Sequence, residues 1–91
     1  MSSSRLILTP FSVEVDGVRV DILEVMKLTY PNDYKMYIVS CRIRYKGITS
    51  RIFPLFVKNE QDLFNKLKVE VTKVKFLELA YGLDEVRRVI S

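Results

Sequence analysis

The stretch from Tyr37 to Val57 constrains the fold more than any other part of the sequence. It consists of two runs of alternating residues on either side of Lys46-Gly47, a pair suited to a two-residue hairpin turn. Because side chains alternate between the two faces of a strand, every second residue before the turn falls on one face. That face is apolar and consists of Tyr37, Val39, Cys41, Ile43 and Tyr45. We therefore expect an antiparallel hairpin with one buried face.

The expected turn also sets the pairing of the two strands. It places Tyr45 opposite Ile48, and the same register sets Arg42 directly across from Arg51 on the outer face. Two like charges opposed on a sheet destabilise it unless an anion lies between them. The register assigns Ile52 and Phe56 to the buried face. It assigns Arg44, Lys46 and Phe53 to the outer face together with the two arginines.

A second hairpin is predicted at Asp16-Gly17, which separates two alternating runs, residues 11–15 and 18–22. Its core pairs are Val15 with Val18, Val13 with Val20 and Phe11 with Ile22. Its outer pairs are Glu14 with Arg19 and Ser12 with Asp21. The core alternation continues through Met26, Leu28 and Tyr30, and at Glu24, which interrupts it, we expect a β-bulge or bend.

A long helix is predicted after the second hairpin. Asn59 is a suitable N-cap, and the helix can run to Tyr81 with Gly82 after its last turn. A strand over residues 69–72 is the alternative, but apolar residues recur at helical spacing. They are Leu63, Leu67, Val71, Val74, Leu77 and Tyr81. A short helix from Leu83 or Asp84 to Ile90 follows.

These elements predict one α+β domain over residues 1–91, in which an antiparallel four-stranded sheet packs against one long helix. We expect residues 1–5 to be a frayed terminus.

A second apolar row runs along the side of the predicted helix opposite to its core stripe. Its members are spaced three and four residues apart, as in a coiled-coil seam. They are Val69, Thr72, Phe76, Leu79 and Leu83. The flanking lysines are Lys66 and Lys73 on one edge and Lys68 and Lys75 on the other.

A helix on one sheet needs only one apolar stripe, so we expect this second row to be a covered interface. One possible cover is the C-terminal segment, folding back through Leu83, Val86, Val89 and Ile90. The other is a protein partner, or a second copy of the chain with Phe76 near a two-fold axis.

The composition excludes most catalytic chemistry. The chain has no histidine, one cysteine and three glycines, and the glycines fall in turns and a cap. Histidine-based catalysis and a glycine-rich phosphate loop are therefore absent, and a thiolate or imidazole metal site is not expected. Cys41 lies on the expected core face. We predict no enzyme activity, no metal and no cofactor.

The sequence also bears on location. No apolar run approaches the roughly 20 residues of a membrane span, and no signal-peptide pattern is present, so we expect a cytoplasmic protein without membrane contact. The single cysteine agrees with a reducing compartment.

The basic outer face has two interpretations. In the first, a single-stranded nucleic acid places phosphates against Arg42, Arg44, Lys46 and Arg51 and stacks bases on Phe53 and Tyr34. The net charge of +4 permits such a partner. In the second, the acidic residues of the first hairpin pair with the arginines across the sheet. Those acidic residues are Glu14, Asp21 and Glu24.

Two motifs carry a family resemblance. Lys46-Gly-Ile-Thr49 is similar to the family's last turn, and Asp62-Leu-Phe-Asn-Lys-Leu67 to its helix start, in a chain of two hairpins followed by one long helix. In this order of elements the chain resembles the positive-cofactor and whirly type of single-strand-binding fold. In size and composition it is also similar to small Sulfolobus-type accessory subunits of DNA machinery, including B-family polymerase-binding proteins. The first resemblance implies pairing through the helix and unpaired DNA on the sheet. The second implies an archaeal, thermophilic source.

We therefore expect a non-catalytic accessory protein in DNA handling. It would either bind single-stranded nucleic acid or dock on a DNA polymerase or transcription complex. The alternative is a protein-interaction or homodimerisation module with no nucleic-acid contact.

Overall fold

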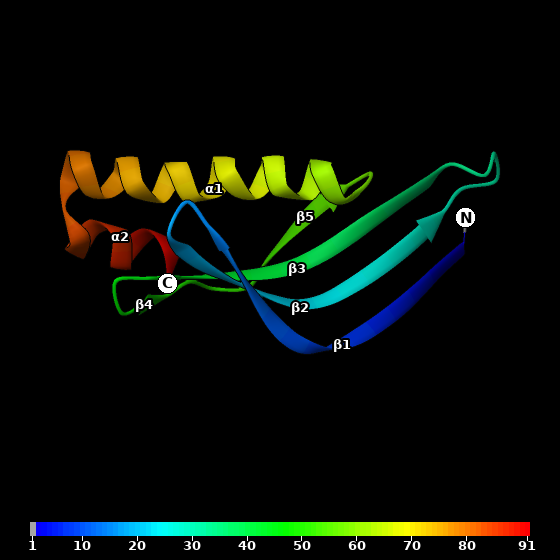
Figure 1. The fold of residues 1–91 in the computed structure, drawn as a ribbon, viewed down its shortest axis with the longest axis horizontal. Helices are drawn as coiled ribbons and strands as arrows, with labels where there is room; N and C mark the ends of the chain where they lie inside the picture. The colour runs from blue at the N-terminus through cyan, green and yellow to red at the C-terminus, as the bar shows by residue number, and fades with distance from the viewer. Residues whose placement is uncertain (1) are drawn as a thin grey trace.

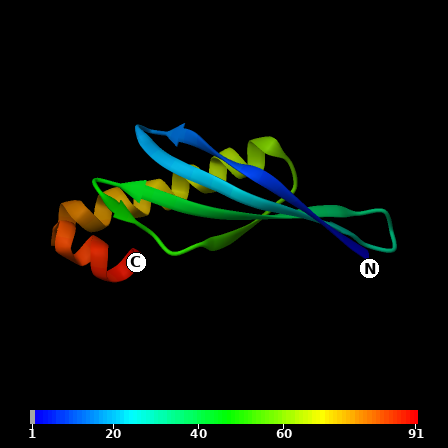
Figure 2. The ribbon, with the colours of Figure 1, turned by 90° about the horizontal axis from the view of Figure 1, so that it is seen from below.

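The computed structural model describes residues 2–91, with side chains described from residue 11 on. It has the predicted α+β architecture, an antiparallel sheet with a long helix on one face (Figures 1 and 2). The predicted fourth strand is divided in two, so the sheet has five strands. The elements are β1 (Ser2–Val15), β2 (Val18–Thr29), β3 (Lys35–Tyr45), β4 (Ile48–Thr49), β5 (Phe53–Val57), α1 (Glu60–Tyr81) and α2 (Leu83–Ile90).

Both predicted hairpin turns are confirmed. Val15 pairs with Val18 around Asp16-Gly17, and Tyr45 pairs with Ile48 around Lys46-Gly47. Both turn residues of each hairpin have positive φ, from 47° to 81°. Two successive positive φ values are typical of type I′ turns, whose twist matches that of the strands they join.

The first strand begins at Ser2. Residues 2–5, which we expected to fray, pair with residues 26–29 of β2, and Met1 lies outside the described residues. Together with the far ends of β2 and β3, this part of β1 extends past the N-terminal end of α1 (Figure 1). The molecule is accordingly elongated, at 46 × 23 × 21 Å.

The bulge expected near Glu24 is present. Ile22 pairs with Cys41 and Glu24 with Ser40, so Leu23 is one extra residue in β2. The extra residue reverses the alternation that follows it. Met26 and Leu28, expected on the core face, therefore lie on the face away from α1, where they pair with Ile38 and Met36.

A second irregularity lies at residues 50–52. Arg44 pairs with Thr49, but Cys41 pairs with Phe53, so three residues face two on β3. The backbone N–H of Arg51 donates to the carbonyl of Ile90 at 2.8 Å, and not to β3. The predicted register holds as far as Ser50, whose N–H donates to the carbonyl of Ile43, and is wrong after it, so the two faces of β5 are exchanged.

The exchange decides which residues of β5 are buried. Leu55 and Val57 belong to the core, whereas Ile52 and Phe56, expected to be buried, are 59% and 50% exposed.

Helix α1 confirms the predicted helix against the strand alternative. The side chain of Asn59 accepts a 2.9 Å hydrogen bond from the N–H of Asp62, and Gly82, with φ 91°, ends the helix. Leu67, Val71 and Val74 are buried against the sheet. Tyr81, expected in the same stripe, is 74% exposed because the last turn of α1 extends beyond the sheet (Figure 1).

Helix α2 confirms the predicted short helix. It folds back beside α1 and β4, and its Val86 is fully buried. Leu83 and Ile90 pack against the same core.

Candidate functional site

The outer row of α1 is the first candidate site. We give this name to Val69, Thr72, Phe76 and Leu79, which lie on the side of α1 away from the sheet. Val69 is 53% exposed, Phe76 63% and Leu79 80%. Leu83, predicted as the fifth member, instead packs against the core as the first residue of α2. The structure thus brings four of the five predicted interface residues together on one exposed surface.

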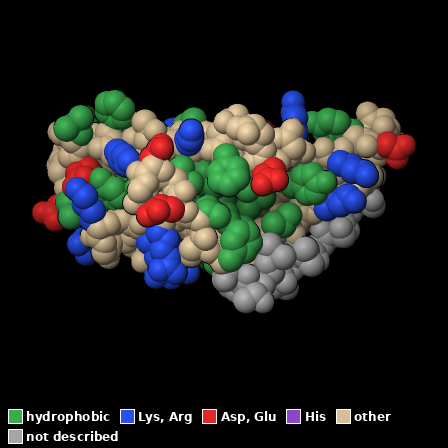
Figure 3. Space-filling view, in the orientation of Figure 1, with side chains coloured by type: hydrophobic (Ala, Val, Ile, Leu, Met, Phe, Trp, Pro, Cys, Tyr) green, Lys and Arg blue, Asp and Glu red, His purple; other side chains and the backbone are tan. Residues whose placement is uncertain are grey.

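Helix α2 does not cover the outer row. Its buried residue is Val86, and its C-terminal end is held at the loop before β5 by hydrogen bonds from Arg51. The C-terminal segment therefore folds back, as one of the two alternatives predicted, but it packs between α1 and the sheet and leaves the outer row exposed. In Figure 3, hydrophobic side chains gather below the middle of α1, between the helix and the sheet, and others stand out over the C-terminal half of α1.

Lysines border the outer row on both edges, as predicted. Lys66 contacts Asp62 and the carbonyl of Phe56, and Lys75 donates to the carbonyl of Asp16 at 2.6 Å. Lys68 and Lys73 line a shallow groove of about 350 Å³ together with Val69, Thr72 and Phe76. The groove combines an apolar floor with a cation on each side.

The second candidate surface is the sheet face away from α1, where Arg42 and Arg44 lie as predicted. Both converge on Asp21, which is only 3% exposed. The Nη2 atom of Arg42 lies 3.0 Å from Oδ2 of Asp21, and Nε of Arg44 lies 2.7 Å from the same oxygen. Nε of Arg19 lies 3.4 Å from Oδ1.

The Asp21 carboxyl is held in its charged form. Burial alone would raise its pKa. Hydrogen bonds from Ser12, Arg44 and Arg42 outweigh burial and hold the pKa well below its ordinary value. This cross-sheet pairing is the structural interpretation that we weighed for Asp21. Three guanidinium groups therefore surround the one carboxylate of Asp21.

Sequence reasoning missed Arg19 as a member of this cluster. Arg19 pairs directly with Arg44 at the end of β2 and β3 far from the loop that joins them. The bulge at Leu23 lies between, so the loop does not reveal that register. Its side chain is 60% exposed, compared with 43% for Arg44 and 28% for Arg42.

The structure places the other three predicted nucleic-acid residues elsewhere. Lys46 donates to both carboxylate oxygens of Glu78 on α1 at 2.9 Å. Arg51 donates from Nη2 to the carbonyl of Val89 at 2.8 Å, and it does not face Arg42. Phe53 is paired with Cys41 and lies on the α1 side of the sheet. The prediction of one continuous basic surface is therefore wrong. In the view of Figure 3, Lys and Arg side chains are spread over the molecule and do not form one patch.

Glu78 links α1 to the second hairpin. It accepts hydrogen bonds from the hydroxyl of Tyr45 and from Lys46, and these lower the pKa of the Glu78 carboxyl. The same interaction with Glu78 raises the pKa of Tyr45. Lys46 therefore forms a salt bridge that connects the second hairpin to α1.

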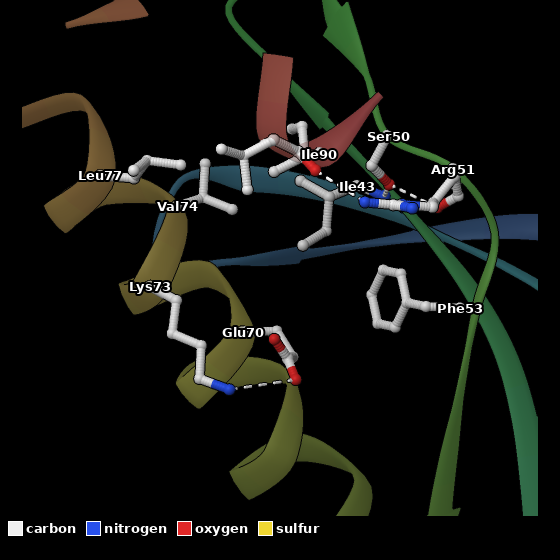
Figure 4. Close-up of a pocket in the computed structure, with 10 residues that line it drawn as sticks. Ile43, Ser50, Arg51, Phe53, Glu70, Lys73, Val74, Leu77 and Ile90 are labelled. Atoms are coloured by element: carbon white, nitrogen blue, oxygen red, sulfur yellow. Dashed lines mark hydrogen bonds and ion pairs between the residues drawn. The ribbon is translucent and has the colours of Figure 1, made fainter. Parts of the chain in front are cut away.

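Phe53 and Arg51 border a half-open groove of about 260 Å³ between α1, α2 and β3 (Figure 4). Its walls are mostly apolar and include Ile43, Val74, Leu77, Val89 and Ile90. Glu70 and Lys73 form a 3.7 Å ion pair at its side. The hydroxyl of Ser50 is occupied, since it accepts from the N–H of Ile43 and donates to the carbonyl of Arg51. The groove presents no free nucleophile.

The remaining chemistry of the described residues is limited. Cys41 is fully buried, and burial raises the pKa of its thiol to about 12. Among residues 2–91, no three His, Cys, Asp or Glu side chains are grouped to hold a metal ion. Neither α1 nor α2 has the length and apolar character needed to cross a membrane.

Comparison with known proteins does not assign the chain to a family. No family model, no curated protein and no solved structure matches the chain.

Proposed function

We propose that this chain is a non-catalytic docking module that binds another protein through the outer row of α1. The observation that carries the proposal is the exposure of Phe76 and Leu79, at 63% and 80%, on a helix whose core stripe is already buried. Contiguous apolar side chains on a stable element typically mark an interaction surface.

The rigidity of α1 supports this role. The helix is capped by Asn59 at one end and Gly82 at the other, and it buries Leu67, Val71 and Val74. A surface held in this way loses little conformational entropy on binding. We place the module in DNA handling, as an accessory protein that docks on a polymerase or transcription complex. The net charge of +4 is compatible with that setting.

The test compares two aspartate substitutions at exposed apolar positions on different surfaces. Tagged wild-type protein, Leu79→Asp and Ile52→Asp are used to isolate associated proteins from native cells, followed by mass spectrometry. Ile52 is 59% exposed and lies outside α1, which makes it a matched control. We expect Leu79→Asp to lose a partner that Ile52→Asp retains. Retention of the same partners by both variants contradicts the proposal.

A second candidate function is binding of nucleic-acid phosphates by Arg19, Arg42 and Arg44. It is favoured by the guanidinium groups of Arg19, Arg42 and Arg44, which gather around one carboxylate on the sheet face away from α1. The cluster is prearranged, because Asp21 holds the arginines in place. Glu14 and Glu24 lie on the same face of the sheet and reduce its positive charge.

This candidate is tested by titrating an unpaired oligonucleotide at two salt concentrations. Arg19→Ala with Arg44→Ala removes two cations and leaves the Arg42–Asp21 pair in place. We expect weaker binding and a smaller salt dependence, with a slope reduced by about 0.7 for each phosphate that the variant no longer neutralises. Lys58→Ala with Arg87→Ala removes the same charge elsewhere and is the control. Equal effects of the two double variants contradict a specific phosphate site.

A further inference from the structure

We propose that the outer row of α1 receives an amphipathic helix of a different protein, with acidic residues along both edges of its apolar face. This inference rests on the proposed docking function and names the chemistry of the partner. It favours a different protein over a second copy of this chain as the occupant.

The spacing of the outer row defines the kind of partner. Val69 and Phe76 are seven residues apart, as are Thr72 and Leu79, so they occupy the a and d positions of two heptads. At 1.5 Å per residue the row is about 15 Å long. A partner helix of about two heptads would therefore cover it.

The lysines occupy the positions that select partners. In the same heptad register, extended one heptad toward the N-terminus, Lys66 and Lys73 are at e and Lys68 and Lys75 are at g. Residues at e and g of one helix face those of its partner and set partner choice and orientation. Here every such position from 66 to 75 carries a positive charge.

This pattern opposes self-pairing. In a parallel pair of α1 helices, e would face g and lysine would meet lysine. In an antiparallel pair, e would face e and g would face g, with the same result. Like charges brought together at an interface oppose association, whereas glutamate or aspartate at the facing positions favours it.

Lys68 and Lys73 are the lysines placed to meet a partner. The other two, Lys66 and Lys75, already contact Asp62 and the carbonyl of Asp16, respectively. Lys73 has a 3.7 Å contact with Glu70 and a side chain that is 67% exposed. Lys68 is exposed and stands on the other side of the same groove. An acidic helix seated on Phe76 would pass between Lys68 and Lys73.

The test uses two synthetic helical peptides, each three heptads long, with leucine at every a and d position. One carries glutamate at every e and g position, and the other carries lysine there. Binding of each peptide is measured by fluorescence anisotropy at low and high salt. The proteins are the wild type, Lys68→Glu with Lys73→Glu, and Leu79→Asp. Lys58→Glu with Arg87→Glu, away from the outer row, gives the same change of net charge as a control. Light scattering reports self-association, and circular dichroism confirms that each variant is folded.

We expect the wild type to be monomeric and to bind the acidic peptide at least about tenfold more tightly than the basic one, with a preference that falls at high salt. The Lys68→Glu, Lys73→Glu variant should reverse the preference, the control should keep it, and Leu79→Asp should bind neither peptide.

Equal binding of both peptides that Leu79→Asp abolishes overturns the inference and leaves the docking function standing. A wild-type dimer that Leu79→Asp dissociates overturns both, because a second copy of the chain then occupies the outer row. A monomer that binds neither peptide overturns the inference, and it removes the docking function too if the isolated partners are unaffected by Leu79→Asp.

Discussion

The carboxylate of Asp21 on β2 accepts a 2.7 Å hydrogen bond from Nε of Arg44 on β3. The two residues are diagonal neighbours on the sheet, because Arg44 is paired with Arg19 and Asp21 with Arg42. The hydrogen bond offsets the repulsion between Arg19 and Arg44, which lie directly across from each other. This charged cluster lies on the sheet face away from α1, whereas the exposed apolar row lies on α1 itself.

Replacing Asp21 with asparagine should destabilise the fold. Asparagine cannot neutralise the arginines, and we expect a loss of about 2 kcal/mol at pH 7, since a nearly buried carboxylate with several donors is removed. Urea denaturation followed by circular dichroism measures the loss. A variant as stable as the wild type contradicts a stabilising role of the cluster.

The same pair of proteins should show a defined pH dependence. The pKa of Asp21 is lower in the folded chain than in the unfolded chain, so its contribution is complete above about pH 5. It is lost as the pH falls below about 4, because the unfolded chain then binds a proton that the folded chain does not. The difference in stability between wild type and Asp21→Asn should therefore shrink between pH 5 and pH 3. A constant difference over this range contradicts the lowered pKa.

Two leucines of α1 should respond in opposite ways to truncation. Leu67 is fully buried, and Leu67→Ala should cost about 2 to 5 kcal/mol through lost burial and the cavity that remains. Leu79 is 80% exposed, so Leu79→Ala should change the free energy of unfolding by less than about 0.5 kcal/mol. Thermal or urea unfolding distinguishes the two. Comparable losses at both positions would show that the outer row is packed in the free protein.

The attachment of α2 should control the backbone at Arg51. The N–H of Arg51 donates to the carbonyl of Ile90, and Val86 anchors α2 in the core. Val86→Ala should loosen α2 and accelerate hydrogen exchange at the Arg51 amide, measured by NMR. Val89→Ala changes a residue that is 40% exposed and should leave this exchange rate nearly unchanged. Unaltered exchange in Val86→Ala contradicts the dependence of this backbone on α2.

Gly47 should be required for the second hairpin turn. Its φ is +81°, and a Cβ there would meet nothing within 4 Å, so the cost of Gly47→Ala is conformational. We expect a loss of about 1 to 2 kcal/mol. Gly47→Asn should lose less, because asparagine tolerates this region better. Equal losses for the two variants would indicate a cause other than backbone conformation.

Local signals made most of the architecture predictable. The turns at Asp16-Gly17 and Lys46-Gly47, the cap at Asn59 and the end at Gly82 each depend on a few adjacent residues, and all four are confirmed. The outer row was also predictable, since helical spacing alone assigns its members to one side.

Features that depend on distant residues were not predictable. The shift at residues 50–52 uses a carbonyl of α2, about 40 residues further along the chain, so the turn register could not reveal it. The same shift moved Phe53 to the core side and separated Arg51 from Arg42. The cluster around Asp21 requires the register between β2 and β3, which is offset by the bulge at Leu23.

Site-directed photo-crosslinking tests the central claim, that the outer row of α1 binds another protein, most directly. A photoreactive phenylalanine analogue is placed at position 76 in one protein and at position 52 in another, and both are irradiated in native cells. Both positions are more than half exposed, but only the first lies in the outer row. We expect an adduct with another protein from position 76 that disappears in the Leu79→Asp background, and none from position 52. Absence of an adduct at position 76, or the same adducts from both positions, contradicts the account.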